Sequence, residues 1–292
     1  MNAGRRPLFG MLLVVGVLGS FSAPLAGHAT AAGLDVFHAD SLAGPMSELK
    51  KAFEGKFDAV TIRLHSGTSK QLAERILKRE ACDVFASSSP AVIDEDLLTK
   101  RILGVDKVAA SWYVVFSANE MVVITGKGNP LGIRQVADLA KPGVTFVRVT
   151  GEKDLATTRT VAFLHKATAL EGQPALAQKI IDGAAVDPAK PNSVPDTVRA
   201  VREGKANAGV VYFSAAVAAR NDVDIIRFPA SVNLSDEIRN AATVPGTARN
   251  EKTALDFVKF LLSAEGQRIL KDTGQPPVVP AIRKGDVPSD LN

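Results

Sequence analysis

The chain has 292 residues, with 35 lysines and arginines against 31 aspartates and glutamates, and its formal net charge is +4. No run of five or more basic residues occurs, and this nearly balanced charge argues against a nucleic-acid partner. The single cysteine, Cys82, excludes an intramolecular disulfide and a cluster of cysteine metal ligands, and it lies too far along the chain to carry an N-terminal lipid.

Residues 1–32 have the features of a cleavable signal peptide. Two arginines precede an apolar stretch, residues 8–25, and Ala29 and Ala31 fit the small-x-small pattern read by signal peptidase. Cleavage is therefore expected after Ala31 or Ala32. Glycine and serine interrupt the apolar stretch, which favours cleavage over a retained membrane anchor. The paired arginines leave both Sec and Tat export open. We expect a soluble protein of the periplasm.

Two hydrophobic periods alternate along the rest of the chain. Short apolar runs that are typical of strands occur at residues 34–39, 59–65, 82–88, 121–126, 144–150, 208–214 and 223–229. Apolar residues recur at helical spacing in segments 47–57, 69–80 and 195–206. This alternation predicts an α/β fold whose sheets are mostly parallel and flanked by helices.

Hydroxyl side chains follow the first two predicted strands, where helices are expected to begin. Ser41 follows the first strand, and Thr68 and Ser69 follow the second. Ligands of open α/β sheets bind beyond the carboxyl ends of strands, and helix N-termini attract anions. Taken alone, Ser41 is better explained as a helix N-cap. Two such junctions on neighbouring strands would face one crevice, so the pattern leaves the capping role and an anion site both open.

Six longer segments carry a resemblance to a known family. They are "VFHADSLAGP", "SGTSKQLAERI", "DVFASSS", "SWYVVFSANEMVVIT", "VREGKANAGVVYFSAA" and "ALDFVKFLLSAEGQRIL". Together they span nearly the whole chain after residue 32, in the order typical of the family. The chain resembles the periplasmic molybdate/tungstate-binding proteins of ABC transporters. The resemblance implies that it is the solute-binding component of an importer.

The resemblance also implies the architecture of a type II periplasmic binding protein. Such a protein has two lobes, each a mostly parallel sheet flanked by helices, joined by two crossovers. The crossovers are expected in "SWYVVFSANEMVV" and "DIIRFPAS". The expected boundaries are residues 33–116 and 228–285 for lobe one, residues 117–227 for lobe two and residues 286–292 for a C-terminal tail.

In that family a tetrahedral oxyanion, molybdate or tungstate, is held between the lobes by two serines, a tyrosine and main-chain amides. These positions correspond here to Ser41, Ser69 and Tyr212, with Thr68 beside Ser69. Neutral donors suit a fully ionised anion. Ser41 is then expected both to cap its helix and to lend its hydroxyl to the anion. The implied partners are the oxyanion and an inner-membrane ABC permease, and we expect a monomer without a cofactor or bound metal cation.

Residues 150–160, "TGEKDLATTRT", depart from the family pattern. They are closer to an archaeal tungstate-binding branch, in which an aspartate at the position of Asp154 can approach the metal centre of the anion. The second carboxylate of that branch would fall near Tyr212 and is missing. Asp154 can therefore contact the ligand, pair with Arg159 or cap the following helix. Arg159 turned toward the ligand would suit sulfate, phosphate or an organic anion as well as molybdate.

Two other classes of function have weaker support. His38 and His65 end the first two predicted strands and can be imagined around a cation with Asp40 or Asp154, but no paired-histidine spacing occurs. Asp40 would also repel a bound dianion unless its carboxylate accepts a hydrogen bond. For hydrolysis, His65 is poorly placed beside Ser66, because adjacent strand residues point to opposite faces. With no nucleophile elbow, P-loop or dinucleotide motif in the sequence, we expect a binding protein and not an enzyme.

Overall fold

The computed structural model describes Met1, Gly4 and residues 32–152 and 154–291. Apart from Met1, Gly4 and Ala32, the predicted signal peptide lies outside the described residues, so its cleavage stays a prediction. The described residues from Ala32 onward belong to one compact unit. Among all these described parts, no helix has the length and apolar character needed to cross a bilayer.

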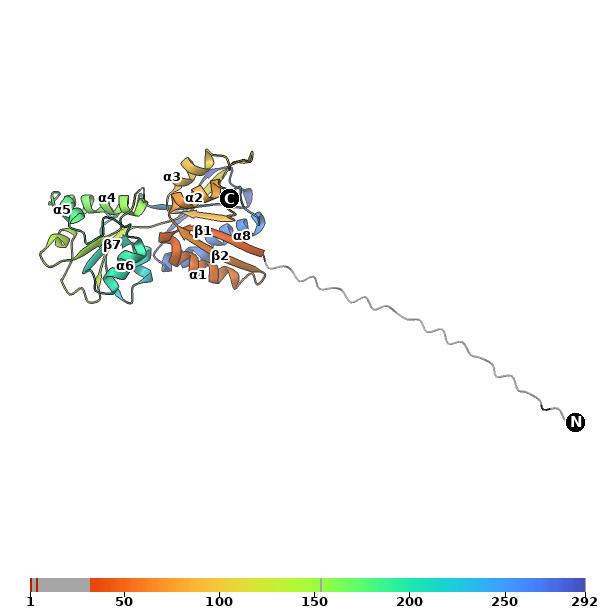
Figure 1. Ribbon diagram of the computed structural model, residues 1–292, viewed down its shortest axis with the longest axis horizontal. Helices are drawn as coiled ribbons and strands as arrows, with labels where there is room; N and C mark the ends of the chain where they lie inside the picture. The colour runs from red at the N-terminus through yellow and green to blue at the C-terminus, as the bar shows by residue number, and fades with distance from the viewer. Residues whose placement is uncertain (2–3, 5–31, 153, 292) are drawn as a thin grey trace. The chain divides into compact units, whose positions relative to one another are not determined.

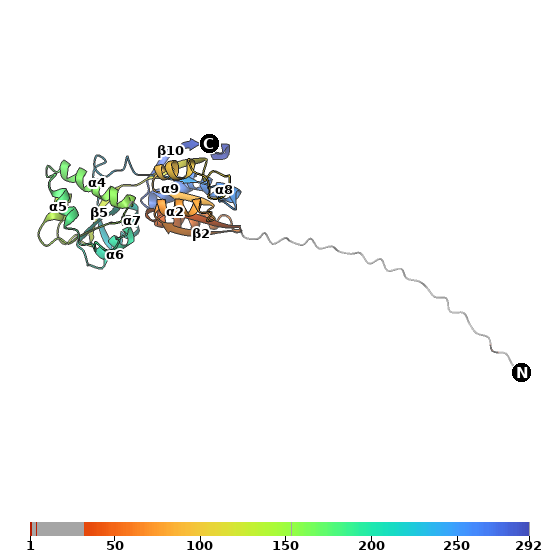
Figure 2. The same cartoon turned by 45° about the horizontal axis from the view of Figure 1, so that its top comes forward.

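Two sheets form the framework of this unit, and Figures 1 and 2 show them side by side in separate lobes. In the described residues, the larger sheet has the order β10-β4-β9-β3-β1-β2 and the smaller sheet the order β6-β7-β5-β8. The strands of the larger sheet are β1 (Ala32–Ala39), β2 (Val60–Gly67), β3 (Val84–Ser87), β4 (Trp112–Ala118), β9 (Arg239–Thr243) and β10 (Pro277–Gly285). Those of the smaller sheet are β5 (Met121–Gly126), β6 (Phe146–Arg148), β7 (Ala208–Tyr212) and β8 (Val223–Ile226).

Helices cover both sheets, and each sheet with its helices is called here the larger or the smaller lobe. The larger lobe contains α1 (Ala43–Glu54), α2 (Ser69–Leu77), α3 (Pro90–Ile93), α8 (Glu251–Leu262) and α9 (Ala264–Asp272). The smaller lobe contains α4 (Leu155–Leu170), α5 (Leu176–Asp182), α6 (Val194–Arg202) and α7 (Phe213–Ala218). Short 3-10 segments lie at Asp40–Leu42, Val136–Ala140 and Ser289–Leu291, and a π-helical turn at Asp94–Leu98.

Strand direction in both sheets is mixed, which refines the expectation of mostly parallel sheets. β1 runs parallel to β2 and β3, whereas β9 runs antiparallel to β3 and β4, and β10 antiparallel to β4. Most strands of the larger sheet therefore point one way, as predicted, but β9 enters from the other lobe and separates β3 from β4. In the smaller sheet β5 is likewise opposed to its neighbours β7 and β8, while β6 and β7 are parallel.

The larger sheet is buried on both faces by two apolar clusters. Side chains of a strand alternate between faces. On β1, Val36 accordingly belongs to the cluster with α1 and α8, and Phe37 to the cluster with α2 and α3. On β3, Val84 and Phe85 divide in the same way. Each fully buried side chain of this size stabilises the fold by about 1.5–3 kcal/mol. These contacts fix the helices whose first residues follow β1 and β2.

The smaller sheet also has helices on both sides, and its core is one continuous cluster. Figure 1 shows α4 and α6 on opposite sides of β7, and Figure 2 shows the two helices on opposite sides of β5 in the same sheet. Consecutive β5 residues from Met121 to Ile124 all belong to this cluster, together with Phe163 of α4 and Val201 of α6. The continuous apolar run of β5 is therefore explained by burial of both strand faces.

Within the described residues, the chain passes between the sheets between β4 and β5 and again between β8 and β9. The first passage consists of residues 119–120. The second, residues 227–238, contributes Val232 and Ile238 to the core of the smaller lobe, beyond the predicted end of that lobe. Leu291, which was expected in a C-terminal tail, is buried against the core of the larger lobe.

Candidate functional site

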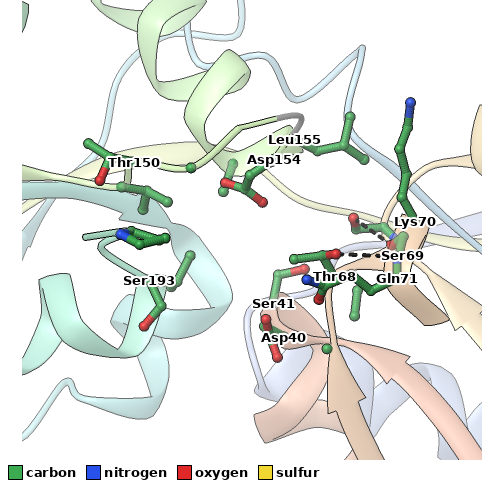
Figure 3. A pocket seen from close by; sticks show the side chains of 18 of the residues that line it. Asp40, Ser41, Thr68, Ser69, Lys70, Gln71, Thr150, Asp154, Leu155 and Ser193 are labelled. Carbon is green, nitrogen blue, oxygen red and sulfur yellow. Dashed lines mark hydrogen bonds between the residues drawn. The ribbon is translucent and has the colours of Figure 1, made fainter. Parts of the chain in front are cut away.

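A cavity of about 470 Å³ is lined by segments of both lobes. The larger lobe contributes residues 39–41, residues 67–71 and Ser88, and the smaller lobe contributes residues 149–152, 154–156 and 191–194 with Tyr212. Figure 3 shows Ser41, Thr68 and Ser69 on one side, facing Thr150, Asp154 and Ser193 on the other. The cavity thus lies where strands of the two sheets end and helices begin.

Helix starts from both lobes line the cavity. α2 begins at Ser69, α4 at Leu155 and α6 at Val194, and all three residues are in its wall. The first amides of a helix have no intrahelical acceptor and carry the positive end of the helix dipole. Within the described parts of the chain, no acceptor is found for the amides of Ser69, Lys70, Leu155 or Ala156. These first turns make the cavity attractive to an anion.

Ser41 lies in the 3-10 turn Asp40–Leu42, and its predicted role as a helix N-cap is wrong. Leu42 holds the N-cap position of α1, without a side-chain hydrogen bond. The Ser41 carbonyl oxygen accepts hydrogen bonds from Ser214 Oγ at 2.9 Å and from Gln275 Nε2 at 3.3 Å. Its hydroxyl has no partner among the described residues, although the residue is only 7% exposed. The hydroxyl is therefore free to donate into the cavity.

Ser69 is the first residue of α2, and Thr68 caps the helix in its place. The Thr68 hydroxyl accepts from the Gln71 amide at 3.4 Å. Ser69 Oγ accepts from the Ser88 amide at 3.1 Å and lies 3.2 Å from Ser88 Oγ. The Ser69 oxygen thus accepts at least one hydrogen bond, and its proton is available to the cavity when Ser88 Oγ is the donor of the contact between the two hydroxyls.

Tyr212 reaches the same cavity from the smaller lobe. It holds the N-cap position of α7 and is 2% exposed. Its hydroxyl oxygen accepts a hydrogen bond from Arg159 Nη1 at 3.0 Å. Burial raises the pKa of Tyr212, so the phenol stays protonated near neutral pH and acts as a donor.

Arg159 does not line the cavity, unlike the other residues predicted for the site. Besides Tyr212, it donates through Nη2 to the carbonyl oxygen of Ser88 at 2.9 Å. No ion pair joins it to Asp154 in the part of the chain that the structure describes. The guanidinium is therefore committed to neighbouring protein groups, and the alternative of direct ligand contact has no support in this geometry.

Asp154 is the N-cap of α4, which confirms one of the three predicted alternatives. Its Oδ2 accepts from the Thr157 amide at 2.8 Å and from the Thr157 hydroxyl at 2.9 Å. Asp154 nevertheless lines the cavity, as do Asp40 and Glu152. The Asp40 carboxylate accepts a hydrogen bond from the Ser66 hydroxyl, which reduces its cost beside an anion.

Sequence reasoning missed part of the wall in the smaller lobe. Ser193 caps α6 by accepting from the Asp196 amide at 3.2 Å, and the two residues form a capping box. Asn192 pairs with Thr150 through backbone hydrogen bonds, which brings the two segments together. The signal was present, because "SVPD" has the S-x-x-D spacing of a capped helix start with proline in the first turn.

The two histidines of the alternative cation site have protein partners. His38 is buried, its Nδ1 lies 3.0 Å from the Ala39 carbonyl oxygen, and burial lowers its pKa. His65 Nε2 lies 2.9 Å from Asp35 Oδ1, on the ladder between β1 and β2. Across the described residues, no group of three or more histidines, cysteines or carboxylates is placed to hold a metal ion.

Comparison with known proteins agrees with this architecture. Residues 34–275 match the family model of the bacterial extracellular solute-binding proteins. The molybdate-binding protein ModA of Mycobacterium tuberculosis is 26% identical over 255 residues, which cover 87% of this chain and 88% of that protein.

Solved structures show the same fold. The periplasmic molybdate-binding protein of Azotobacter vinelandii aligns with a TM-score of 0.64 and 19% identity, covering 85% of this chain and 99% of that one. The sulfate-binding protein SubI of Mycobacterium tuberculosis aligns with a TM-score of 0.61 and 16% identity, covering 85% and 88%. The predicted two-lobed α/β fold is confirmed, and the chain belongs to the family of bacterial extracellular solute-binding proteins.

Proposed function

We propose that this protein is the periplasmic binding component of an ABC importer and that it holds a tetrahedral oxyanion, molybdate or tungstate, in the cavity. One observation carries the proposal. The hydroxyls of Ser41, Ser69 and Tyr212 and the uncommitted amides that begin α2 and α4 line one cavity from both lobes. Relatives whose names state molybdate binding support the choice of anion.

The chemistry of these donors fits a fully ionised anion. Molybdate and tungstate at neutral pH have only acceptor oxygens, so every contact must come from a hydroxyl or an N–H group. Neutral donors on preorganised helix starts supply such contacts without bringing a mobile counter-charge into the cavity. Lys70 lines the cavity, but Figure 3 shows its side chain extending away from Ser41 and Ser69. The backbone and the hydroxyls therefore carry the recognition.

Donors on both lobes also explain transport. A ligand held by Ser41 and Ser69 on the larger lobe and by Tyr212 on the smaller lobe binds best when the lobes are together. Binding then shifts the population toward the closed form by the difference in affinity between the two forms. The membrane permease would recognise that closed shape.

A second candidate, an anion that itself carries a proton or an organic group, is favoured by the carboxylates in the wall. Asp40, Glu152 and Asp154 all line the cavity, and a carboxylate can accept a hydrogen bond from a protonated phosphate or from an organic hydroxyl. The volume of about 470 Å³ is also ample for a ligand larger than one tetrahedral oxyanion.

Isothermal titration calorimetry tests both candidates. The protein is purified from the periplasmic fraction, stripped of endogenous ligand and titrated in parallel with molybdate, tungstate, sulfate and phosphate. We expect molybdate and tungstate to bind at least about a hundredfold more tightly than sulfate, because donor spacing set by two lobes discriminates anion size. If phosphate binds most tightly, the second candidate is favoured. If none of the four anions gives a binding signal, the oxyanion proposal is contradicted.

A further inference from the structure

A chain of hydrogen bonds joins two hydroxyls of the cavity wall across the two lobes. It runs from Tyr212 to Arg159 in the smaller lobe and from Arg159 to Ser88 and Ser69 in the larger lobe. The two residues that end this hydrogen-bond chain, Tyr212 and Ser69, line the cavity, whereas Arg159 does not. Arg159 is thus placed behind the wall and between the two residues that the proposed function needs most.

At the smaller-lobe end, Arg159 determines which way the Tyr212 hydroxyl can point. A guanidinium is a donor only, so the phenol oxygen must accept its N–H at 3.0 Å. The phenol proton cannot point at a donor and must turn away from Arg159. In the described residues Tyr212 Oη has no other partner, and Tyr212 lines the cavity, so the phenol proton is available to a ligand there.

At the larger-lobe end, Arg159 fixes the peptide that supports Ser69. Its Nη2 donates at 2.9 Å to the carbonyl oxygen of Ser88, and the amide of the same Ser88 donates at 3.1 Å to Ser69 Oγ. Ser88 is 5% exposed and Ser69 is 3% exposed, so water competes little for these bonds. The Ser69 oxygen accepts this bond, and when Ser88 Oγ, 3.2 Å away, also donates to it, the Ser69 proton is left for a ligand in the cavity.

Among the described residues, no carboxylate lies within ion-pair distance of Arg159. Both of its hydrogen-bond acceptors are neutral oxygens, and no ion pair of Arg159 occurs within the described residues. A positive charge behind the wall attracts a dianion in front of it without contacting the dianion. The guanidinium reaches the two acceptors through two separate nitrogens, Nη1 and Nη2, a rigid geometry that the single ammonium nitrogen of a lysine does not reproduce.

We infer that Arg159 is a positioning residue that orients the Tyr212 and Ser69 hydroxyls as donors and holds the lobes together through Ser88, a role that rests on the proposed oxyanion function. The bound anion touches the two hydroxyls and not the guanidinium. Arg159 thus links closure of the two lobes to the orientation of the Tyr212 and Ser69 hydroxyl protons.

A double-mutant cycle with sodium molybdate tests the inference. Arg159→Met should weaken molybdate binding about tenfold or more in the natural background, but only about threefold in a Tyr212→Phe background, where there is no hydroxyl left to orient. Arg159→Lys should restore only part of the affinity, because one ammonium nitrogen replaces the two nitrogens that reach Tyr212 and Ser88 separately. Arg202→Met, an exposed arginine of the same lobe, is the control and should bind as the natural protein does. Equal losses in the two backgrounds would overturn the inference.

A second measurement needs no ligand, so it separates failure of this inference from failure of the proposed function. The chain has two tyrosines, so a Tyr113→Phe background leaves Tyr212 alone in a tyrosinate absorbance titration. Arg159 opposes the effect of burial on the pKa of Tyr212, and its replacement by methionine should therefore raise that pKa further. An unchanged titration midpoint would overturn the contact even if molybdate binds. A raised midpoint in a protein that binds no anion would support the contact and reject the oxyanion.

Discussion

The two lobes use polar side chains near the cavity in different ways. In the larger lobe, Thr68 caps its helix and the adjacent Ser69 keeps its proton available, while Ser41 caps nothing. In the smaller lobe, Asp154 and Ser193 are themselves the caps of α4 and α6. The larger lobe therefore presents two serine hydroxyls that cap no helix, whereas the smaller lobe presents, besides Tyr212, two helix starts whose own caps line the cavity.

This division predicts different consequences of mutation. Removing a hydroxyl from Ser41 removes a donor that no described residue uses, so affinity should fall while the fold is kept. Removing a cap from the smaller lobe leaves helix amides without their acceptor, so stability should fall first. A Ser41 variant that loses stability before affinity, or a cap variant that loses affinity before stability, would contradict this comparison.

The largest effect is expected from the pair Ser41→Ala and Ser69→Ala. Each lost donor should cost about 1–3 kcal/mol of binding free energy, so the double variant should lose about 2–6 kcal/mol in molybdate affinity by calorimetry. Ser89→Ala is a matched control, because Ser89 holds the N-cap position of α3 without a side-chain hydrogen bond and lies outside the cavity wall. A folded double variant that binds molybdate normally would remove the larger lobe from the proposed site.

Capping in the smaller lobe should matter next. Ser193→Ala removes the acceptor of the Asp196 amide, and a lost serine cap typically costs about 1 kcal/mol. Urea unfolding should show this loss, with a smaller change in molybdate affinity than in the serine pair above. A variant that keeps full stability but loses binding would mean that Ser193 contacts the ligand instead.

A substitution of Asp154 can separate the effect of its helix cap from the effect of its negative charge. Asparagine caps helices as well as aspartate does, so Asp154→Asn should preserve stability while it removes a negative charge from the cavity wall. Molybdate should then bind a few times more tightly, because repulsion of the dianion is reduced. Weaker binding, measured by the same calorimetry, would indicate that the carboxylate approaches the metal centre, as in the archaeal tungstate-binding branch.

The residues that the larger lobe contributes to the cavity wall were easier to predict from the sequence than those of the smaller lobe, for a physical reason. Ser41 and Ser69 follow strands directly, so strand end, hydroxyl and helix start appear together in a short stretch. Ser193 follows a loop, and only its bridge partner segment, around Thr150, places it at the cavity. Pairing between distant segments leaves no local pattern, and the capping signal alone does not say what the helix start faces.

The same limit applies to the sheets and to Arg159. β9 has the sequence RNAAT, which shows none of the branched apolar residues of a buried strand, yet it lies between β3 and β4. Its burial comes from its neighbours and not from its own hydrophobicity. Arg159 was expected at the ligand because of its charge. Its acceptors are a tyrosine hydroxyl and a main-chain carbonyl from the other lobe, which no spacing in the sequence reveals.

The smallest predicted effect is a loss of stability of the larger lobe in acid. On the larger sheet, hydrogen bonds from Arg63 lower the pKa of Asp35 to about 2, whereas the ordinary value is 3.8. A lowered carboxyl pKa contributes stability above pH 4 that is lost as the pH falls toward 2, because the unfolded chain takes up the proton first. Water screens the half-exposed Arg63, so the change should be modest.

Asp35→Asn tests this acid response. The variant lacks the titrating carboxylate, so its free energy of unfolding in urea should change less between pH 5 and pH 2.5 than that of the natural protein. Because Asp35 lies in the middle of β1 and outside the cavity wall, molybdate affinity at neutral pH should stay unchanged. The same pH dependence in both proteins would show that acid acts on other carboxylates, such as Asp138 and Asp196 of the smaller lobe, whose pKa values are also lowered by hydrogen bonds despite burial. In that case the acid-sensitive lobe would be the one whose helix starts depend on carboxylate caps.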